Sequence, residues 1–61
     1  MPYVNVKVAG KLTKEQRSRI AAKITKTLQE EADKKPESTY IVFEEVERES
    51  WAVGGRLLSD M

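Results

Sequence analysis

The chain has 61 residues, which is enough for one domain only. Its eleven basic and ten acidic side chains give a net charge of +1, and this balance argues against nucleic acid as a partner. It contains no cysteine and no histidine, which excludes disulfides, zinc fingers and Cys–His catalytic pairs. A monomer of this size buries only about 60% of the surface that its unfolded chain exposes. We therefore expect a single domain over residues 1–61 that gains further core by self-association.

The apolar runs of the chain all fall below the roughly 20 residues that a membrane-spanning helix needs. The N-terminus also lacks a basic region followed by a long apolar stretch, which is the pattern of a signal peptide. The sequence thus predicts a cytoplasmic protein that binds neither membranes nor nucleic acid.

The chain opens with Met1-Pro2 and an alternating apolar segment, Tyr3 to Val8, that predicts a half-buried strand. Methionine aminopeptidase removes an initiator methionine that precedes proline, and this leaves a secondary amine at the head of the strand. Because a paired strand cannot move, the amine is held at one point and can act as a general base. The alternative is that Pro2 is only a permitted residue at a strand start, where its missing N–H does no harm.

A helix is predicted after a short turn at Gly10. The segment from Thr13 to Gln16 fits the capping box that opens a helix. Lys34 and Lys35 suit the negative end of the helix dipole, and Pro36 is expected to end the helix. The apolar positions along it recur at helical spacing and are Ile20, Ala21, Ile24, Leu28 and Ala32. We therefore expect a crossover helix of about twenty residues with one apolar face.

A second strand is predicted over residues 39–46, so the order strand, helix, strand indicates a right-handed βαβ unit with parallel strands. The segment Trp51–Gly55 then predicts a turn or hairpin that reaches toward a neighbour. Two strands and one helix leave one sheet face and both edges uncovered, and such a unit should not persist as a monomer. Trp51 has two open interpretations, namely the core of an interface or the apolar wall of a pocket.

In this order and at this length, Met1-Pro2 before an alternating strand, the βαβ unit and the segment Trp51–Gly55 resemble the 4-oxalocrotonate tautomerase (2-hydroxymuconate tautomerase) family of the tautomerase superfamily. The resemblance covers the whole chain. It implies an α+β fold of the tautomerase (MIF-like) type, in which two protomers, each a single βαβ unit with a short C-terminal hairpin, form one four-stranded sheet. Members of this family associate as dimers, and commonly as a homo-hexamer that is a trimer of dimers.

The resemblance also implies an activity. Members are isomerases that interconvert enol and keto forms of unsaturated 2-oxo or 2-hydroxy acids, such as the 2-hydroxymuconate-type dienols of aromatic degradation. Their N-terminal proline, Pro2 here, is the general base, and no metal or cofactor is required. A free α-amine has a pKa of about 8, and burial beside apolar walls or cations lowers this pKa. The amine is then neutral at pH 7 and can accept a proton. The alternatives are a related Pro-dependent activity (dehalogenase, hydratase or decarboxylase) or an oligomeric protein without catalysis.

The family's substrate-binding positions carry over only in part. Trp51 matches the aromatic residue that lines the pocket. Leu12 occupies the place of an arginine that binds a substrate carboxylate, and Lys11 lies one residue earlier. Tyr40 occupies the place of a second arginine, at the start of strand two, and can donate a hydrogen bond but not a bidentate charged clamp.

Arg48 and Arg56 flank the Trp51 segment and are candidate replacements for the missing cations, although each also fits an ordinary solvated surface arginine. Loss of both family arginines should weaken binding of a dicarboxylate more than it weakens proton transfer by Pro2. We therefore expect modest activity toward the usual dienol diacids and a substrate that is less acidic. In the related activities a carboxylate often activates water. Alternation along the strand places Glu44 and Glu45 on opposite faces, and we assign that role to neither.

Overall fold

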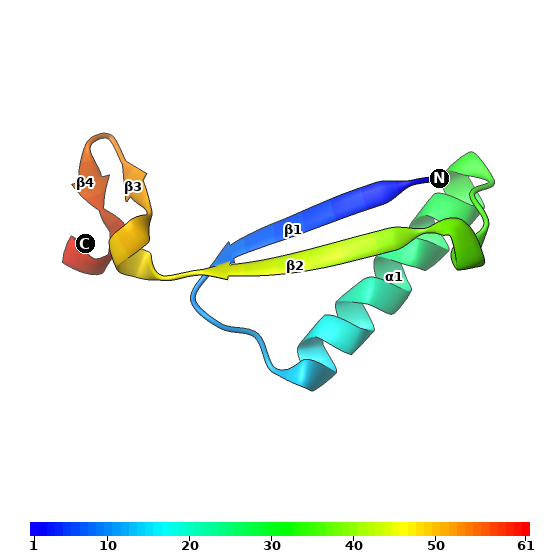
Figure 1. The fold of residues 1–61 in the computed structure, drawn as a ribbon, viewed down its shortest axis with the longest axis horizontal. Coiled ribbons are helices and arrows are strands. Elements are labelled where there is room, and N and C mark those ends of the chain that lie inside the picture. Colours follow the sequence, from blue (N-terminus) through cyan, green and yellow to red (C-terminus); the bar gives the residue numbers. More distant parts are fainter.

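The computed structural model describes all 61 residues. Its main elements are strand β1 (Tyr3–Ala9), helix α1 (Lys14–Ala32), strand β2 (Tyr40–Val46) and a hairpin of β3 (Ala52–Val53) and β4 (Arg56–Leu57) (Figure 1). Three short 3-10 helices lie between or after them, at Pro36–Ser38, Arg48–Ser50 and Leu58–Asp60. The predicted α+β arrangement of a βαβ unit with a C-terminal hairpin is confirmed.

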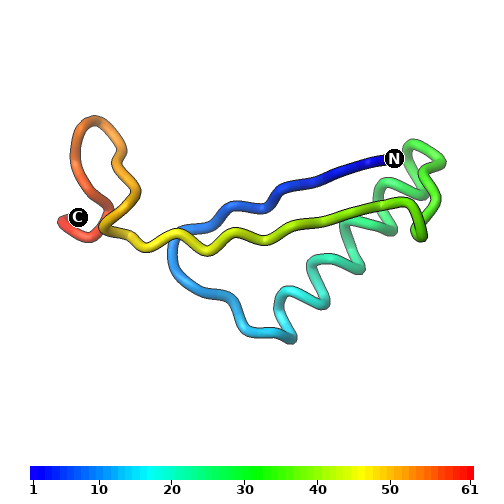
Figure 2. Tube along the Cα trace, viewed as in Figure 1, coloured from blue at the N-terminus to red at the C-terminus, as the bar shows by residue number.

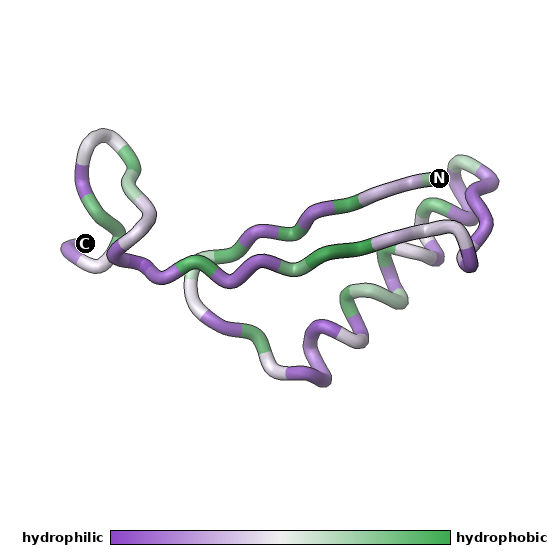
Figure 3. Tube along the Cα trace, viewed as in Figure 1, coloured by the Kyte–Doolittle hydropathy of each residue, from purple (hydrophilic) through white to green (hydrophobic).

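The two long strands form a parallel pair in which Tyr3 lies opposite Tyr40 and Ala9 lies opposite Val46. Polar and apolar residues alternate along β1, whereas β2 has an apolar run, Ile41 to Phe43, followed by Glu44 and Glu45 (Figure 3). One face of the pair packs toward α1 and is half-buried; its apolar side chains are Val4, Val6, Val8, Ile41 and Phe43. The other face, which we call the open face, has no element of this chain over it and carries Tyr3, Asn5, Lys7, Tyr40, Val42 and Glu44.

Helix α1 begins where the capping box predicts. The Thr13 hydroxyl accepts a hydrogen bond from the Gln16 N–H at 3.1 Å, and the Gln16 side chain accepts one from the Thr13 N–H at 2.9 Å. These two bonds satisfy backbone donors that have no partner within the first turn of the helix.

The C-terminal end of α1 corrects the prediction. The helix stops at Ala32, because Asp33 adopts a left-handed conformation (φ 55°) and the Lys34 N–H donates to the Leu28 carbonyl at 3.2 Å, a common way to close a helix. Pro36 therefore does not end the helix but begins the next 3-10 helix. Lys34 and Lys35 lie beyond the last turn, and Ala32, which was expected on the apolar face, is exposed.

The C-terminal hairpin pairs Ala52 with Leu57 and Val53 with Arg56. Its two-residue turn consists of Gly54 (φ 61°) and Gly55 (φ 80°). A two-residue turn with positive φ at both positions matches the twist of the flanking strands, and glycine adopts it without steric cost.

A single copy of this chain has no core. None of its 61 residues is buried, and large apolar side chains such as Tyr3, Tyr40, Val42 and Val53 are 60%, 55%, 42% and 57% exposed. The radius of gyration is 14.5 Å, whereas a compact domain of this length has about 10 to 11 Å. The hairpin extends past the end of the sheet, away from the helix (Figures 1 and 2). The helix is too polar to cross a membrane.

Candidate active site

The start of the chain is attached to the sheet. Pro2 is half-buried, and its carbonyl accepts a hydrogen bond from the Tyr40 N–H at 2.9 Å, which extends the parallel ladder by one step beyond β1. Met1 is 88% exposed and is therefore within reach of an aminopeptidase. Removal of Met1 leaves the Pro2 amine at the end of the sheet, next to a backbone group that is held in place.

Two tyrosines lie beside this end of the sheet. Tyr3 and Tyr40 are neighbours across β1 and β2, and both residues are more than half exposed on the open face. The Tyr3 hydroxyl accepts a bond from the Asn5 side-chain amide at 3.4 Å, and the same amide donates to Glu44 at 2.6 Å. The Tyr40 hydroxyl takes part in no hydrogen bond within the chain, so it is available to donate to a ligand.

The other candidate residues lie at the opposite end of the sheet, beyond the C-terminal ends of the parallel strands. A seven-residue strand spans about 20 Å. Trp51 is half-buried and follows the 3-10 helix that begins at Arg48; its N–H donates to the Arg48 carbonyl at 3.3 Å, and its own carbonyl accepts from the Leu58 N–H at 2.8 Å. Lys11 lies near the same end, because the Gly10 N–H bonds the Val46 carbonyl at 2.9 Å.

One copy of the chain therefore does not bring the candidate site together. Pro2 and Tyr40 lie at one end of the sheet, whereas Lys11, Arg48 and Trp51 lie at the other (Figure 1). Both Lys11 and Arg48 are exposed, and neither forms an ion pair within the chain. Arg56 differs from them, because its guanidinium donates to the Asp60 carbonyl at 2.7 Å and ties the hairpin to the tail.

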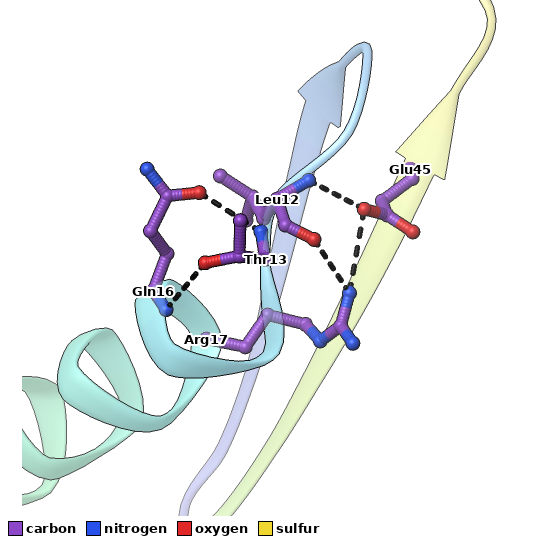
Figure 4. A network of polar contacts seen from close by, with 5 residues as sticks. All are labelled: Leu12, Thr13, Gln16, Arg17 and Glu45. Carbon is purple, nitrogen blue, oxygen red and sulfur yellow. Dashed lines mark hydrogen bonds and ion pairs between the residues drawn. The ribbon is translucent and has the colours of Figure 1, made fainter.

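A polar network joins the loop after β1 to strand β2 (Figure 4). The Glu45 carboxylate accepts a hydrogen bond from the Leu12 N–H at 2.6 Å and lies 3.4 Å from an Arg17 guanidinium nitrogen. That same nitrogen donates to the Leu12 carbonyl at 3.0 Å. This network was not among the features predicted from the sequence. One feature of the sequence could have indicated it. Glu45 is charged, although it lies on the same side of β2 as Ile41 and Phe43, the side that faces the helix.

An open pocket of about 260 Å³ lies between β1 and α1 and is lined by Val4, Lys23, Ile24, Thr27 and Leu28. None of the candidate site residues lines it. No group of three or more His, Cys, Asp or Glu side chains is placed to hold a metal ion.

Comparison with known proteins agrees with this architecture. The family model described as tautomerase enzyme matches residues 2–61. The chain belongs to the tautomerase family. The 2-hydroxymuconate tautomerase of Bacillus subtilis is 36% identical over 61 residues, which cover 100% of this chain and 98% of the relative. The probable tautomerase of Bacillus cereus is 38% identical over 60 residues, which cover 98% of this chain and 98% of the relative.

Solved structures place this tautomerase more narrowly. The structure of YwhB, a homologue of 4-oxalocrotonate tautomerase, is 35% identical with a TM-score of 0.91, and 98% of each chain is covered. A heterohexameric 4-oxalocrotonate tautomerase from Chloroflexus aurantiacus J-10-fl has a TM-score of 0.89 at 18% identity, over 100% of this chain and 98% of that one, and shows the shared fold. This tautomerase is thus a member of the 4-oxalocrotonate tautomerase family and an isomerase.

Proposed function

We propose that this tautomerase interconverts the enol and keto forms of unsaturated 2-oxo acids, and that the Pro2 amine is its general base. The observation that supports the role of Pro2 is its anchored position, half-buried with its carbonyl bonded to the Tyr40 N–H at 2.9 Å. The neutral amine accepts the enol hydroxyl proton, and the O–H electron pair stays on oxygen as an enolate. As that pair forms the C=O bond, the C=C pair takes the proton from the ammonium at carbon, and the neutral amine is regenerated. Rates of phenylenolpyruvate ketonisation for wild type and Pro2→Ala test the assignment.

The carboxylates of β2 favour tautomerisation over the related hydratase and dehalogenase chemistry. Those reactions need a carboxylate near the proline to activate water. Glu44 bonds Asn5 on the open face, and Glu45 bonds the Leu12 N–H on the helix face. Both glutamates lie toward the C-terminal end of β2, whereas Pro2 lies at its start. Within one copy neither glutamate lies beside Pro2, and each carboxylate is already held by its hydrogen bond, so we assign the activation of water to neither.

The complete site needs a second copy of the chain. When two sheets meet in antiparallel orientation, the N-terminal end of one sheet lies next to the C-terminal end of the other. Such a pairing places Pro2 and Tyr40 of one copy near Lys11, Arg48 and Trp51 of another. It also supplies core to a chain in which no residue is buried. We expect a homo-oligomer, either a dimer with a four-stranded sheet or a hexamer of three dimers, in which other copies cover the open face.

Each remaining candidate then has a defined task. The Trp51 ring forms the apolar wall beside the amine and limits its solvation. Lys11 and Arg48 carry the positive charge that meets a substrate carboxylate, and the Tyr40 hydroxyl donates a hydrogen bond to a substrate oxygen.

The substitution Trp51→Ala tests the pocket wall. We expect kcat/KM for phenylenolpyruvate to fall by about tenfold or more while the oligomer stays intact, because the amine loses apolar cover and the substrate loses a contact surface. Steady-state kinetics and size-exclusion chromatography measure the two effects. Val53→Ala, at an exposed position of the same hairpin, is the matched control. Smaller species on the column would show that Trp51 is interface core instead, and unchanged kinetics would exclude it from the site.

The substitution Tyr40→Arg tests the substrate class. We expect wild type to use the monoacid phenylenolpyruvate more efficiently than the diacid 2-hydroxymuconate, because position 40 next to Pro2 holds a tyrosine and not an arginine. An arginine at position 40 should raise kcat/KM for the diacid by about tenfold and change the monoacid little, since charge-assisted bidentate bonds to a carboxylate are the stronger kind. Tyr40→Phe is the control that removes only the hydroxyl. An equal gain or loss with both substrates would contradict the assignment.

A further inference from the structure

The loop between β1 and α1 is anchored on both sides of Lys11. On one side the Gly10 N–H donates to the Val46 carbonyl at 2.9 Å. On the other side the Leu12 N–H donates to the Glu45 carboxylate at 2.6 Å, and the Leu12 carbonyl accepts from the Arg17 guanidinium at 3.0 Å (Figure 4). The Lys11 backbone is therefore fixed, whereas its side chain is exposed and free to reach a ligand.

The bonds around Leu12 depend on two charged side chains. The acceptor of the Leu12 N–H is an ionised carboxylate, and such charge-assisted bonds are shorter and stronger than neutral ones. The Glu45 and Arg17 side chains are only 32% and 37% exposed, so water competes with them less than at an open surface. Glu45 also lies near the N-terminus of α1, where the helix dipole favours negative charge. The ion pair between Arg17 and Glu45, at 3.4 Å, contributes less than the hydrogen bond from the Leu12 N–H to Glu45.

Glu45 bonds the loop before α1 rather than filling the space between β2 and α1. Glu45 follows Ile41 and Phe43 on the helix side of β2, where an apolar residue would bury more surface. Instead it satisfies the backbone N–H of the residue that directly follows Lys11. Partial burial of the Glu45 carboxylate costs free energy, and the bond that fixes the conformation of this loop offsets that cost.

We propose that Glu45 and Arg17 are positioning residues that fix the loop carrying Lys11, so that the Lys11 ammonium meets the substrate carboxylate at a defined point. The inference rests on the proposed function, in which Lys11 binds that carboxylate. Neither Glu45 nor Arg17 contacts substrate; they act through Lys11. Their removal should therefore raise KM for an acidic substrate and leave kcat nearly unchanged.

A double-mutant cycle on the full-length protein tests this. With phenylenolpyruvate, Lys11→Ala and Glu45→Ala should each raise KM by about tenfold at nearly constant kcat. In the Lys11→Ala background, Glu45→Ala should cause no further increase, because the cation that it positions is already absent. Equal effects of Glu45→Ala with and without Lys11, or an unchanged KM, would overturn the proposal.

Further variants separate positioning from stability. Glu45→Gln keeps an oxygen that accepts from the Leu12 N–H and should restore most of the wild-type KM. Glu47→Ala removes an exposed acid whose side chain makes no capping bond and should match wild type. If Glu45→Ala does not fold, Arg17→Met, which keeps the aliphatic stem, gives the same cycle with Lys11. A Pro2→Ala variant with undiminished rate would refute the proposed base without deciding the Lys11–Glu45 coupling.

Discussion

Replacement of Pro2 by alanine should lower kcat for ketonisation of phenylenolpyruvate by about a hundredfold or more, the range that a positioned general base contributes. Alanine also allows removal of Met1, so the variant still has an N-terminal amine. That amine is primary and turns freely, whereas the proline nitrogen is fixed by its ring and by the bond between the Pro2 carbonyl and the Tyr40 N–H. Initial rates on protein whose intact mass shows loss of Met1 measure the effect.

The second proline provides the matched control. Pro36 is exposed and starts a 3-10 helix between α1 and β2. Pro36→Ala makes the same chemical change at an exposed proline whose nitrogen is a peptide nitrogen and cannot be a base, so it should keep the wild-type rate. Both variants should elute as wild type on a sizing column. Equal rates for Pro2→Ala and wild type would refute Pro2 as the base.

The substitution Val42→Asp should abolish assembly, the folded state and activity together. Val42 is 42% exposed on the open face, where we propose that another copy covers it. A carboxylate there would be desolvated without a partner, at a cost of several kcal/mol. Because no residue is buried in a single copy, a chain that cannot assemble has no core to keep it folded. Analytical ultracentrifugation and circular dichroism measure assembly and folding.

Two comparisons make this result specific. Val42→Thr keeps the shape of the side chain, and its neutral hydroxyl costs far less to bury than a carboxylate, so it should assemble with a modest loss of stability. The unfolding temperature of wild type should rise with protein concentration, since assembly and folding are then one equilibrium. A Val42→Asp protein that sediments and melts like wild type would show that the open face is not an interface.

Local chemistry made most of the fold predictable. The alternating residues of β1 and the apolar-rich segment of β2 predicted the two long strands, the Thr13–Gln16 capping box predicted the helix start, and Gly54-Gly55 predicted a turn or hairpin. The helix end was not predictable in the same way. Asp33 takes the left-handed conformation that glycine or asparagine more often adopts, so the stronger signal, Pro36, pointed to a later stop.

The candidate site was predictable in part. The position of Pro2 at the head of β1 follows directly from the alternating strand that it precedes. The Arg17–Glu45 contact joins residues 28 positions apart. It depends on how α1 is rotated against β2, which side-chain packing determines and local sequence does not. The pairing of sheets that we propose would likewise be a property of the assembly, and a single chain keeps Pro2 and Trp51 at opposite ends of the sheet.

The most direct test of the central claim is the intact mass of the active protein together with its rate on phenylenolpyruvate. We predict that the purified, fully active oligomer lacks Met1 on every chain, because only then is the Pro2 nitrogen an amine that can accept a proton. An active preparation that retains Met1 would contradict the account, since the Pro2 nitrogen would then be an amide and the base would have to lie elsewhere.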